Sequence, residues 1–236
     1  MKKRCSLIVA SVLFAVCFIN LSLLTANLIE FTELSTGLKI IIGALSAVSG
    51  YGASFFYCQS LNEKKAYKFM RKFLLLLFVF YIIILVDFTL IDDKFGRDIF
   101  KVFSWESSAY SDYLKSRTNF IPFATVRLFI NGYINSCLGL WDTVINLAGN
   151  FLIFMPLPFF LRIFRKKRLT AARMLAAVVL TVVSVEALQF IFLTGSCDID
   201  DLILNTSGAM LSYYLITRKR VGSGLNRLTF KVWELL

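Results

Sequence analysis

The chain has 236 residues and a formal net charge of +11, with 58% apolar residues and only 17% charged residues. An ordinary soluble domain is about 45–50% apolar and about 25% charged, so this composition excludes that class and predicts that the apolar excess is buried in lipid. The sequence contains no histidine, which excludes Ser-His-Asp and Cys-His catalysis and the histidine-based zinc motifs.

Six apolar runs are predicted to cross a membrane as helices. A run of about 17–25 apolar residues spans a hydrocarbon core about 30 Å thick. The sixth run is the shortest, and it spans the core only if Asp200 and Asp201 lie at the interface. The predicted fold is therefore an all-α polytopic membrane bundle of about six transmembrane helices. In chain order the runs are Leu7–Leu28, Leu38–Cys58, Phe73–Ile91, Leu147–Phe164, Met174–Leu193 and Leu202–Ile216.

The first run follows three basic residues and resembles both a signal anchor and a cleaved signal peptide. Its apolar stretch is longer than the usual signal-peptide core of about 7–15 residues, which favours retention as a membrane anchor. Cleavage after Leu24-Thr25-Ala26 is the alternative.

Lysine and arginine residues gather in alternate connections between the apolar runs. Short cytoplasmic loops carry such an excess, so the protein is predicted to lie in the cell membrane with both termini on the cytoplasmic side. Basic residues near the surface attract anionic lipid headgroups, which makes membrane lipids the predicted partners, whereas nucleic-acid binding needs a continuous basic face on a soluble fold. The oligomeric state stays open. These residues are Lys2, Lys3, Arg4, Lys64, Lys65, Lys68, Arg71, Lys72, Arg162, Arg165, Lys166, Lys167, Arg168, Arg173, Arg218, Lys219, Arg220, Arg227 and Lys231.

The segment Asp92–Asp142 is the longest connection and is predicted to lie on the outer side. Within it, Ile121–Ile134 is apolar but interrupted by polar residues, which is typical of an interfacial or re-entrant element. The preceding Trp105, Tyr110 and Tyr113 fit an aromatic interfacial belt. A loop that rests on the membrane and a catalytic lid are both open interpretations.

Two polar residues interrupt the fifth run. Glu186 and Gln189 are three residues apart and therefore share one helix face. A carboxylate near the middle of a membrane helix costs about 2.5 kcal/mol or more, so Glu186 is expected to face protein or water.

Acidic residues gather where the sixth run begins. Helix capping and the helix dipole explain Asp200 and Asp201, but they do not explain these residues together with Asp198 and Asn205. Carboxylate oxygens also bind Mg²⁺ and Ca²⁺. We predict a ligand-binding cluster without an assigned metal or cofactor, and a divalent cation remains the alternative.

Amide side chains occupy the entrances of two other elements. Asn119 precedes Pro122, and Asn146 and Asn150 lie one turn apart at the start of the fourth run, which Pro156 interrupts. These amides are candidates for ligand binding, and satisfying backbone groups near the prolines is the equally weighted alternative.

Five cysteines occur without CxxC spacing, which argues against a zinc site. Cys137 and Cys197 both fall on the predicted outer side, and whether they form a disulfide stays open.

The motifs resemble, in this order, those of the VanZ-like family, bacterial membrane proteins linked to teicoplanin resistance. The resemblance covers about Asn119–Tyr214, and the first two predicted helices lie outside it. We predict three parts, namely two transmembrane helices with a cytoplasmic loop over 1–72, a VanZ-like membrane domain over 73–217 and a basic cytoplasmic tail over 218–236. The resemblance depends on Asn119-Phe120-Ile121-Pro122-Phe123, Asn146-Leu147-Ala148-Gly149-Asn150, Phe154-Met155-Pro156-Leu157, Ser184 with Glu186 and Gln189, and Asp198-Ile199-Asp200-Asp201-Leu202-Ile203-Leu204-Asn205-Thr206-Ser207-Gly208.

Two positions depart from the family pattern. Pro158 stands where the family commonly has glycine, and Gly195, Ser196 and Cys197 occupy the stretch where it commonly has an arginine. If that arginine holds an anionic ligand, its loss here weakens the family function.

The resemblance implies a membrane protein of the cell envelope whose outward polar cluster recognises a cell-wall precursor or glycopeptide and lowers teicoplanin susceptibility. An enzyme acting on lipid or cell-wall precursors, with Glu186 as general acid or base, is the first alternative. A proton-coupled transporter that uses Asp87 and Glu186 is the second. Whether the protein is catalytic stays open.

Overall fold

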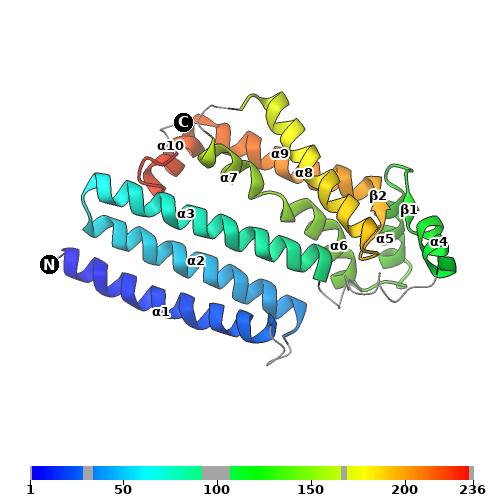
Figure 1. Ribbon diagram of the computed structural model, residues 1–236, viewed down its shortest axis with the longest axis horizontal. Coiled ribbons are helices and arrows are strands. Elements are labelled where there is room, and N and C mark those ends of the chain that lie inside the picture. The colour runs from blue at the N-terminus through cyan, green and yellow to red at the C-terminus, as the bar shows by residue number, and fades with distance from the viewer. Residues whose placement is uncertain (1, 29–33, 92–106, 166–168, 234–236) are drawn as a thin grey trace. The chain divides into compact units, whose positions relative to one another are not determined.

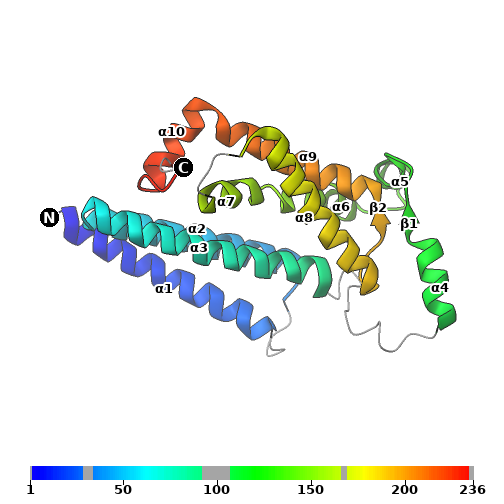
Figure 2. The same ribbon diagram turned by 45° about the horizontal axis from the view of Figure 1, so that its top comes forward.

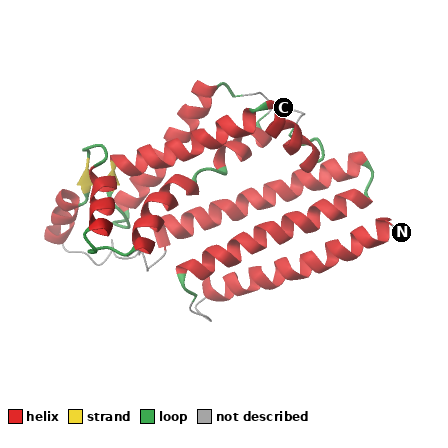
Figure 3. Ribbon diagram, turned by 180° about the vertical axis from the view of Figure 1, so that it is seen from behind, coloured by secondary structure: helices red, strands yellow, loops and turns green. Residues whose placement is uncertain are grey.

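The computed structural model describes residues 2–28, 34–91, 107–165 and 169–233 (Figure 1). Nearly all of the described chain is helical, with one pair of two-residue strands (Figure 3). The predicted all-α class is therefore confirmed. The elements are α1 Lys2–Leu28, α2 Thr36–Ser60, α3 Glu63–Val86 with its π-helical continuation η1 Asp87–Ile91, α4 Ser107–Ser116, β1 Thr118–Asn119, α5 Ala124–Ile134, α6 Leu140–Ile153, α7 Leu157–Phe164, α8 Ala171–Ile191, β2 Cys197–Asp198, α9 Ile199–Thr217 and α10 Lys219–Leu228.

Five helical segments are long and apolar enough to cross a membrane, and the first five predicted runs lie in them. The sixth predicted run forms most of α9, which is helical throughout but more polar because it carries Asp200, Asp201 and Asn205. Long apolar side chains such as Phe18 and Leu180 lie on the outside of these helices, as expected of surfaces that face lipid. The five segments are Lys3–Asn27, Gly37–Ser60, Glu63–Ile91, Leu140–Phe164 and Ala171–Ile191.

The chain divides into two compact units, one made of Met1–Phe80 with Gly222–Leu235 and one made of Tyr81–Val221. These boundaries come from packing, and the three-part division at residues 72 and 217 stays a prediction.

The first unit is formed by α1, α2 and the first part of α3. The Ser6 hydroxyl donates a hydrogen bond to the carbonyl of Phe56, which joins α1 to α2. The rings of Tyr57 and Phe69 contact each other at a tilt of 59°, with centroids 4.8 Å apart. The C-terminal tail packs on this unit, where Phe230 contacts Phe55 at 5.4 Å between ring centroids.

The second unit is organised around the antiparallel pair α8 and α9, with α6 and α7 against it (Figure 2). Its core consists of apolar side chains from α3, α6, α7, α8 and α9, among them Phe154, Met174 and Val178. Pro156 interrupts the predicted fourth run and separates α6 from α7. The hydroxyl of Tyr81 donates a hydrogen bond to the carbonyl of Ile153, the last residue of α6.

The interfacial element predicted over Ile121–Ile134 forms helix α5, which begins at Ala124. Pro122 disfavours helical geometry at Ile121, which explains why the helix starts later than the apolar pattern does. Trp105, in the aromatic flank before this element, lies outside the described residues. Lys166, Lys167 and Arg168 also lie outside them.

Candidate functional site

A short parallel strand pair brings two distant segments together. Thr118 pairs with Cys197 and Asn119 with Asp198, and the amide of Cys197 donates to the carbonyl of Arg117 at 2.9 Å. The Tyr113 hydroxyl, one turn earlier in α4, donates to the carbonyl of Gly195. These bonds fix the segment before α5 against the start of α9.

Asp198 is the N-cap residue of α9 and also binds the segment of α5. One carboxylate oxygen accepts from the amide of Asp200 at 2.9 Å and from Nδ2 of Asn119 at 3.1 Å. The other oxygen accepts from the hydroxyl of Thr125. The side chain is only 6% exposed, so its charge is stabilised by protein donors rather than by water.

Asp200 caps helix α5, although it belongs to α9. Its carboxylate accepts hydrogen bonds from the amides of Phe123, Thr125 and Val126, the last two at 2.8 and 3.1 Å. The N-cap residue of α5, Phe123, has a left-handed φ of 63° and makes no side-chain capping bond, because its side chain carries no hydrogen-bond acceptor. A buried carboxylate at this position satisfies three free amides and interacts favourably with the helix dipole.

Asp201 is half-buried and points toward α6, where Nδ2 of Asn150 donates to it. One turn earlier, Nδ2 of Asn146 donates to the backbone carbonyl of Asp142 at 2.8 Å. The two asparagines therefore line the same face of α6 as the predicted spacing requires.

A cavity of about 390 Å³ lies among these groups. This volume falls within the range of small-molecule sites, about 300–1,000 Å³. Apolar side chains of α5, α6 and α9 and polar side chains of β1, β2 and the same helices line the cavity together. The lining residues are Ser116, Arg117, Thr118, Asn119, Thr125, Val126, Leu128, Phe129, Asn146, Leu147, Asn150, Ser196, Asp198, Asp200, Asp201 and Leu204.

Six of the predicted site residues line this cavity, namely Asn119, Asn146, Asn150, Asp198, Asp200 and Asp201. The remaining three lie elsewhere in the second unit.

Gln189 is 6% exposed and donates from Nε2 to the carbonyl of Thr89 at 3.0 Å, so it joins α8 to η1. Asn205 is 3% exposed, and its Oδ1 atom accepts no hydrogen bond from the described residues. Glu186 is half-buried and close enough to Cys197 to influence it electrostatically.

Cys137 and Cys197 are both free thiols in this structure, although their pairing was left open by the sequence. Burial raises the pKa of the Cys197 thiol, and the nearby carboxylates of Glu186 and Asp198 raise it further. Burial likewise raises the pKa of the Tyr113 phenol. Among the residues that the structure describes, no group of three or more His, Cys, Asp or Glu side chains is arranged to hold a metal ion.

Arg117 lines the cavity but was not selected from the sequence. Its guanidinium carbon lies 5.9 Å from the centroid of the Tyr113 ring. The carbonyl of Arg117 accepts a hydrogen bond from the amide of Cys197, and Arg117 and Ser196 both line the cavity. A cation therefore lies beside the stretch that lacks the arginine of the family pattern. Its position two residues before Asn119 was the only feature of the sequence that could have pointed to Arg117. That position becomes informative once β1 is known to pair with β2.

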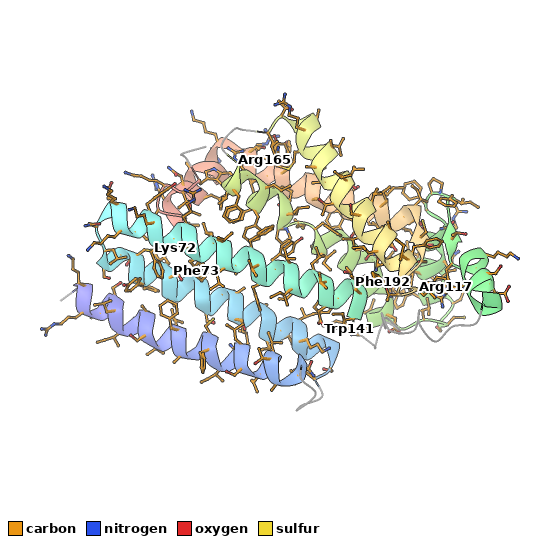
Figure 4. All side chains as sticks on the ribbon, in the orientation of Figure 1. Lys72, Phe73, Arg117, Trp141, Arg165 and Phe192 are labelled. Atoms are coloured by element: carbon orange, nitrogen blue, oxygen red, sulfur yellow. The ribbon has the colours of Figure 1, made fainter. Side chains whose placement is uncertain are left out.

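The second unit has two chemically different ends (Figure 4). Arg117, Trp141 and Phe192 lie at the end that holds the cavity, whereas Arg165, from the basic connection after α7, lies at the opposite end.

The family model described as VanZ/LLP1 matches residues 78–220 of the chain. No curated protein matches the chain. No solved structure matches it either.

Proposed function

The chain belongs to the VanZ/LLP1 family, and on this basis we propose that it is an envelope protein that binds a ligand in its polar cavity and lowers susceptibility to teicoplanin. The observation that carries the proposal is the cavity itself. Its lining combines amide, carboxylate and guanidinium groups with apolar side chains such as Leu128 and Phe129. Such a mixture is typical of sites that orient a small molecule through a few polar contacts.

We also propose that both termini lie in the cytoplasm and that the cavity faces outward. The basic residues of the N-terminus, the start of α3 and the segment around the end of α7 support this orientation through the excess of positive charge on the cytoplasmic side. The position of Arg165 at the end of the second unit opposite Arg117 agrees with it (Figure 4). A cell-wall precursor or glycopeptide would then reach the cavity from outside the cell.

Binding is preferred to the enzymatic alternative because of where Glu186 lies. Glu186 is the residue on which acid–base chemistry would depend, yet it does not belong to the lining of the cavity. A ligand that contacts the amides of Asn146 and Asn150 therefore meets groups suited to recognition, and Glu186 is not among the residues around it.

The proposal is tested by expressing the chain in a sensitive Gram-positive host and measuring the minimum inhibitory concentration of teicoplanin, with vancomycin in parallel. We expect protection against teicoplanin relative to an empty vector, and we expect a Glu186→Gln variant at equal membrane abundance to retain it. Absence of protection by the unmodified chain would overturn the proposal. Protection that is lost in Glu186→Gln alone would favour the enzymatic alternative.

A further inference from the structure

We propose that the turn before α5 and one face of α5 are inserted into a leaflet of the membrane, with the helix parallel to the membrane surface. The partner of this surface is the lipid itself, at the boundary between headgroups and acyl chains. The inference goes beyond the proposed function and does not depend on it, because it concerns how this segment meets the membrane and not what the cavity binds.

The turn before α5 carries apolar side chains that remain exposed. Phe120 is 72% exposed, Ile121 is 71% exposed and Phe123 is 57% exposed, and Pro122 between them is exposed as well. Removing one such phenylalanine or isoleucine side chain from water is worth about 1.5–3 kcal/mol. A contiguous apolar surface of this kind indicates contact with a membrane or another protein.

The backbone amides of the same turn are paired within the protein. The amide of Ile121 donates to Oδ1 of Asn119 at 3.0 Å, and the proline that follows has no N–H group. The amide of Ala124 donates to the carbonyl of Ile121 at 3.2 Å. The other three amides of residues 123–126 donate to the carboxylate of Asp200. Each backbone N–H group of this turn therefore has an acceptor in the protein.

Exposed apolar side chains and paired backbone donors together favour lipid over water as the surroundings of the turn. Water supplies an acceptor to any exposed N–H group, so an exposed turn in water does not need acceptors from the protein. Lipid supplies none, and an unpaired N–H group there costs several kcal/mol. Asp200 thus satisfies the start of α5 in a way that allows the turn to enter an apolar layer.

Helix α5 has three faces of different character. Its exposed apolar side chains share one face, its exposed polar side chains share the adjacent face, and the remaining face lines the cavity through Thr125 and Phe129. The apolar face consists of Ile130, Tyr133 and Ile134, and the polar face consists of Arg127, Asn131 and Asn135.

These faces indicate a helix that lies in the interface and does not cross the membrane. The 11 residues of α5 extend over about 16 Å, roughly half of a hydrocarbon core about 30 Å thick. A helix that dips into the core would bring Arg127 and Asn131 into lipid, which is costly. Interfacial helices instead bury an apolar face about 5–10 Å deep and keep the polar face toward water. The cavity beside α5 then lies at the depth of the headgroups.

Lipid is favoured over a second copy of the chain because the exposed apolar surface continues onto a membrane span. Helix α5 packs against α6, which begins the candidate span Leu140–Phe164. The first two residues of that span, Leu140 and Trp141, are 58% and 64% exposed. Tryptophan at the end of a span is typical of the membrane interface, so α5 and the start of α6 meet the same lipid layer.

The test measures the surroundings of single positions in the full-length chain, reconstituted in phospholipid vesicles. The five cysteines are replaced by alanine, and one new cysteine at a time is labelled with the environment-sensitive fluorophore NBD. Phe120→Cys and Ile130→Cys probe the turn and the apolar face. Arg127→Cys and Asn131→Cys are the matched controls on the polar face. Lipids that carry a nitroxide on the acyl chain quench a fluorophore that lies among the chains.

We expect Phe120→Cys and Ile130→Cys to show blue-shifted emission and to lose most of their fluorescence to nitroxide lipids. Arg127→Cys and Asn131→Cys should keep most of theirs. Since Ile130 and Asn131 are neighbours in the sequence, a difference between them reports the faces of the helix and not the depth of the whole segment.

Equal quenching at the four positions, or water-like emission at Phe120→Cys and Ile130→Cys, would overturn the inference. Blue-shifted emission at these two positions without quenching by lipid would also overturn it, because protein such as a second copy of the chain would then cover them.

Thermal unfolding curves equal to that of the unmodified protein show that the labelled variants are folded. If the cysteine-free chain unfolds at a lower temperature, benzoylphenylalanine in place of Phe120 in the otherwise unmodified chain provides the measurement. Illumination should then attach phospholipid to the protein, as detected by mass spectrometry. A crosslink to a second copy alone, or no crosslink, would overturn the inference. No antibiotic is used, so this outcome is independent of the outcome for the proposed function.

Discussion

Asp198, Asp200 and Asp201 lie within four consecutive positions of the sequence, yet their carboxylates bind different parts of the structure. Asp200 is 1% exposed and Asp198 is 6% exposed, and both bind groups of the protein. Asp201 is half-buried and lies toward the amides of α6. Asp198 and Asp200 therefore hold α5 and its preceding segment against α9, whereas Asp201 joins α9 to α6, and all three line the cavity.

Replacing Asp200 by Asn is predicted to loosen α5. The amide cannot accept three backbone hydrogen bonds as a carboxylate does, and the loss of bonds to a charged group costs about 1.5–3 kcal/mol. Hydrogen exchange at the amides of Thr125 and Val126 should therefore become faster by at least about tenfold. Asp142→Asn, which changes an exposed aspartate at the start of α6, is the control, and unchanged exchange in Asp200→Asn would contradict the capping role.

The thiol of Cys197 is predicted to be a slow nucleophile. Burial and the negative charges of Glu186 and Asp198 raise its pKa, so less thiolate is present at pH 8. Glu186→Gln removes one negative charge, lowers that pKa toward its ordinary value and should accelerate alkylation by iodoacetamide, followed by peptide mass spectrometry. The rate at exposed Cys137 should not change. A rate at Cys197 that stays the same or falls in the variant would show that Glu186 does not act on this thiol.

The packing of α6 on α9 is the element-scale feature that forms one wall of the cavity. Asn150 on α6 and Asp201 on α9 form a hydrogen bond across this contact. Leu147 and Leu204, each three residues away on the same helix, also line the cavity. The helices come so close that a Cβ atom built on Gly208 would lie 1.6 Å from the carbonyl oxygen of Phe151. A backbone atom cannot move aside as a flexible side chain can, so the contact requires glycine at this position.

Gly208→Ala is predicted to force α6 and α9 apart. The overlap should lower the free energy of unfolding by about 3 kcal/mol or more, at the upper end of the usual cost of overpacking. Gly149→Ala is the matched control, because a Cβ atom at Gly149 meets nothing within 4 Å and alanine favours a helix. Denaturation of both variants in detergent provides the measurement, and equal stabilities would contradict the close crossing.

Hydropathy predicted most elements because its signal is local. The six apolar runs correspond to α1, α2, α3, the pair α6 and α7, α8 and α9. Pro122 accounts for the start of α5 at Ala124. Local patterns could not predict that Asp200 caps α5, since the residues that bond are 75 positions apart in the sequence. The same limit concealed Arg117, whose place in the cavity follows from the pairing of β1 with β2.

The separation of Glu186 and Gln189 from the cavity has the same cause. Their spacing establishes a shared face of α8, but it does not determine which element that face meets. In the structure Gln189 meets η1, which the sequence presented only as the end of an apolar run.

At the scale of the whole molecule, the proposed topology predicts the accessibility of two exposed cysteines. Cys5 lies at the start of α1 and Cys137 in the connection between α5 and α6. A membrane-impermeant maleimide applied to intact cells should label Cys137 and leave Cys5 unlabelled until the cells are opened. Labelling of Cys5 alone in intact cells would show the opposite orientation.

In the proposed function, the amides of the cavity, rather than the fold alone, carry the protection against teicoplanin. The decisive measurement compares the minimum inhibitory concentration of teicoplanin for hosts expressing the unmodified chain, an Asn146→Ala/Asn150→Ala variant and an Asn131→Ala control at equal membrane abundance. Asn131 is an exposed amide of α5 outside the cavity lining. We predict that protection is lost in the double variant and kept in the control. Full protection by the double variant would contradict the account.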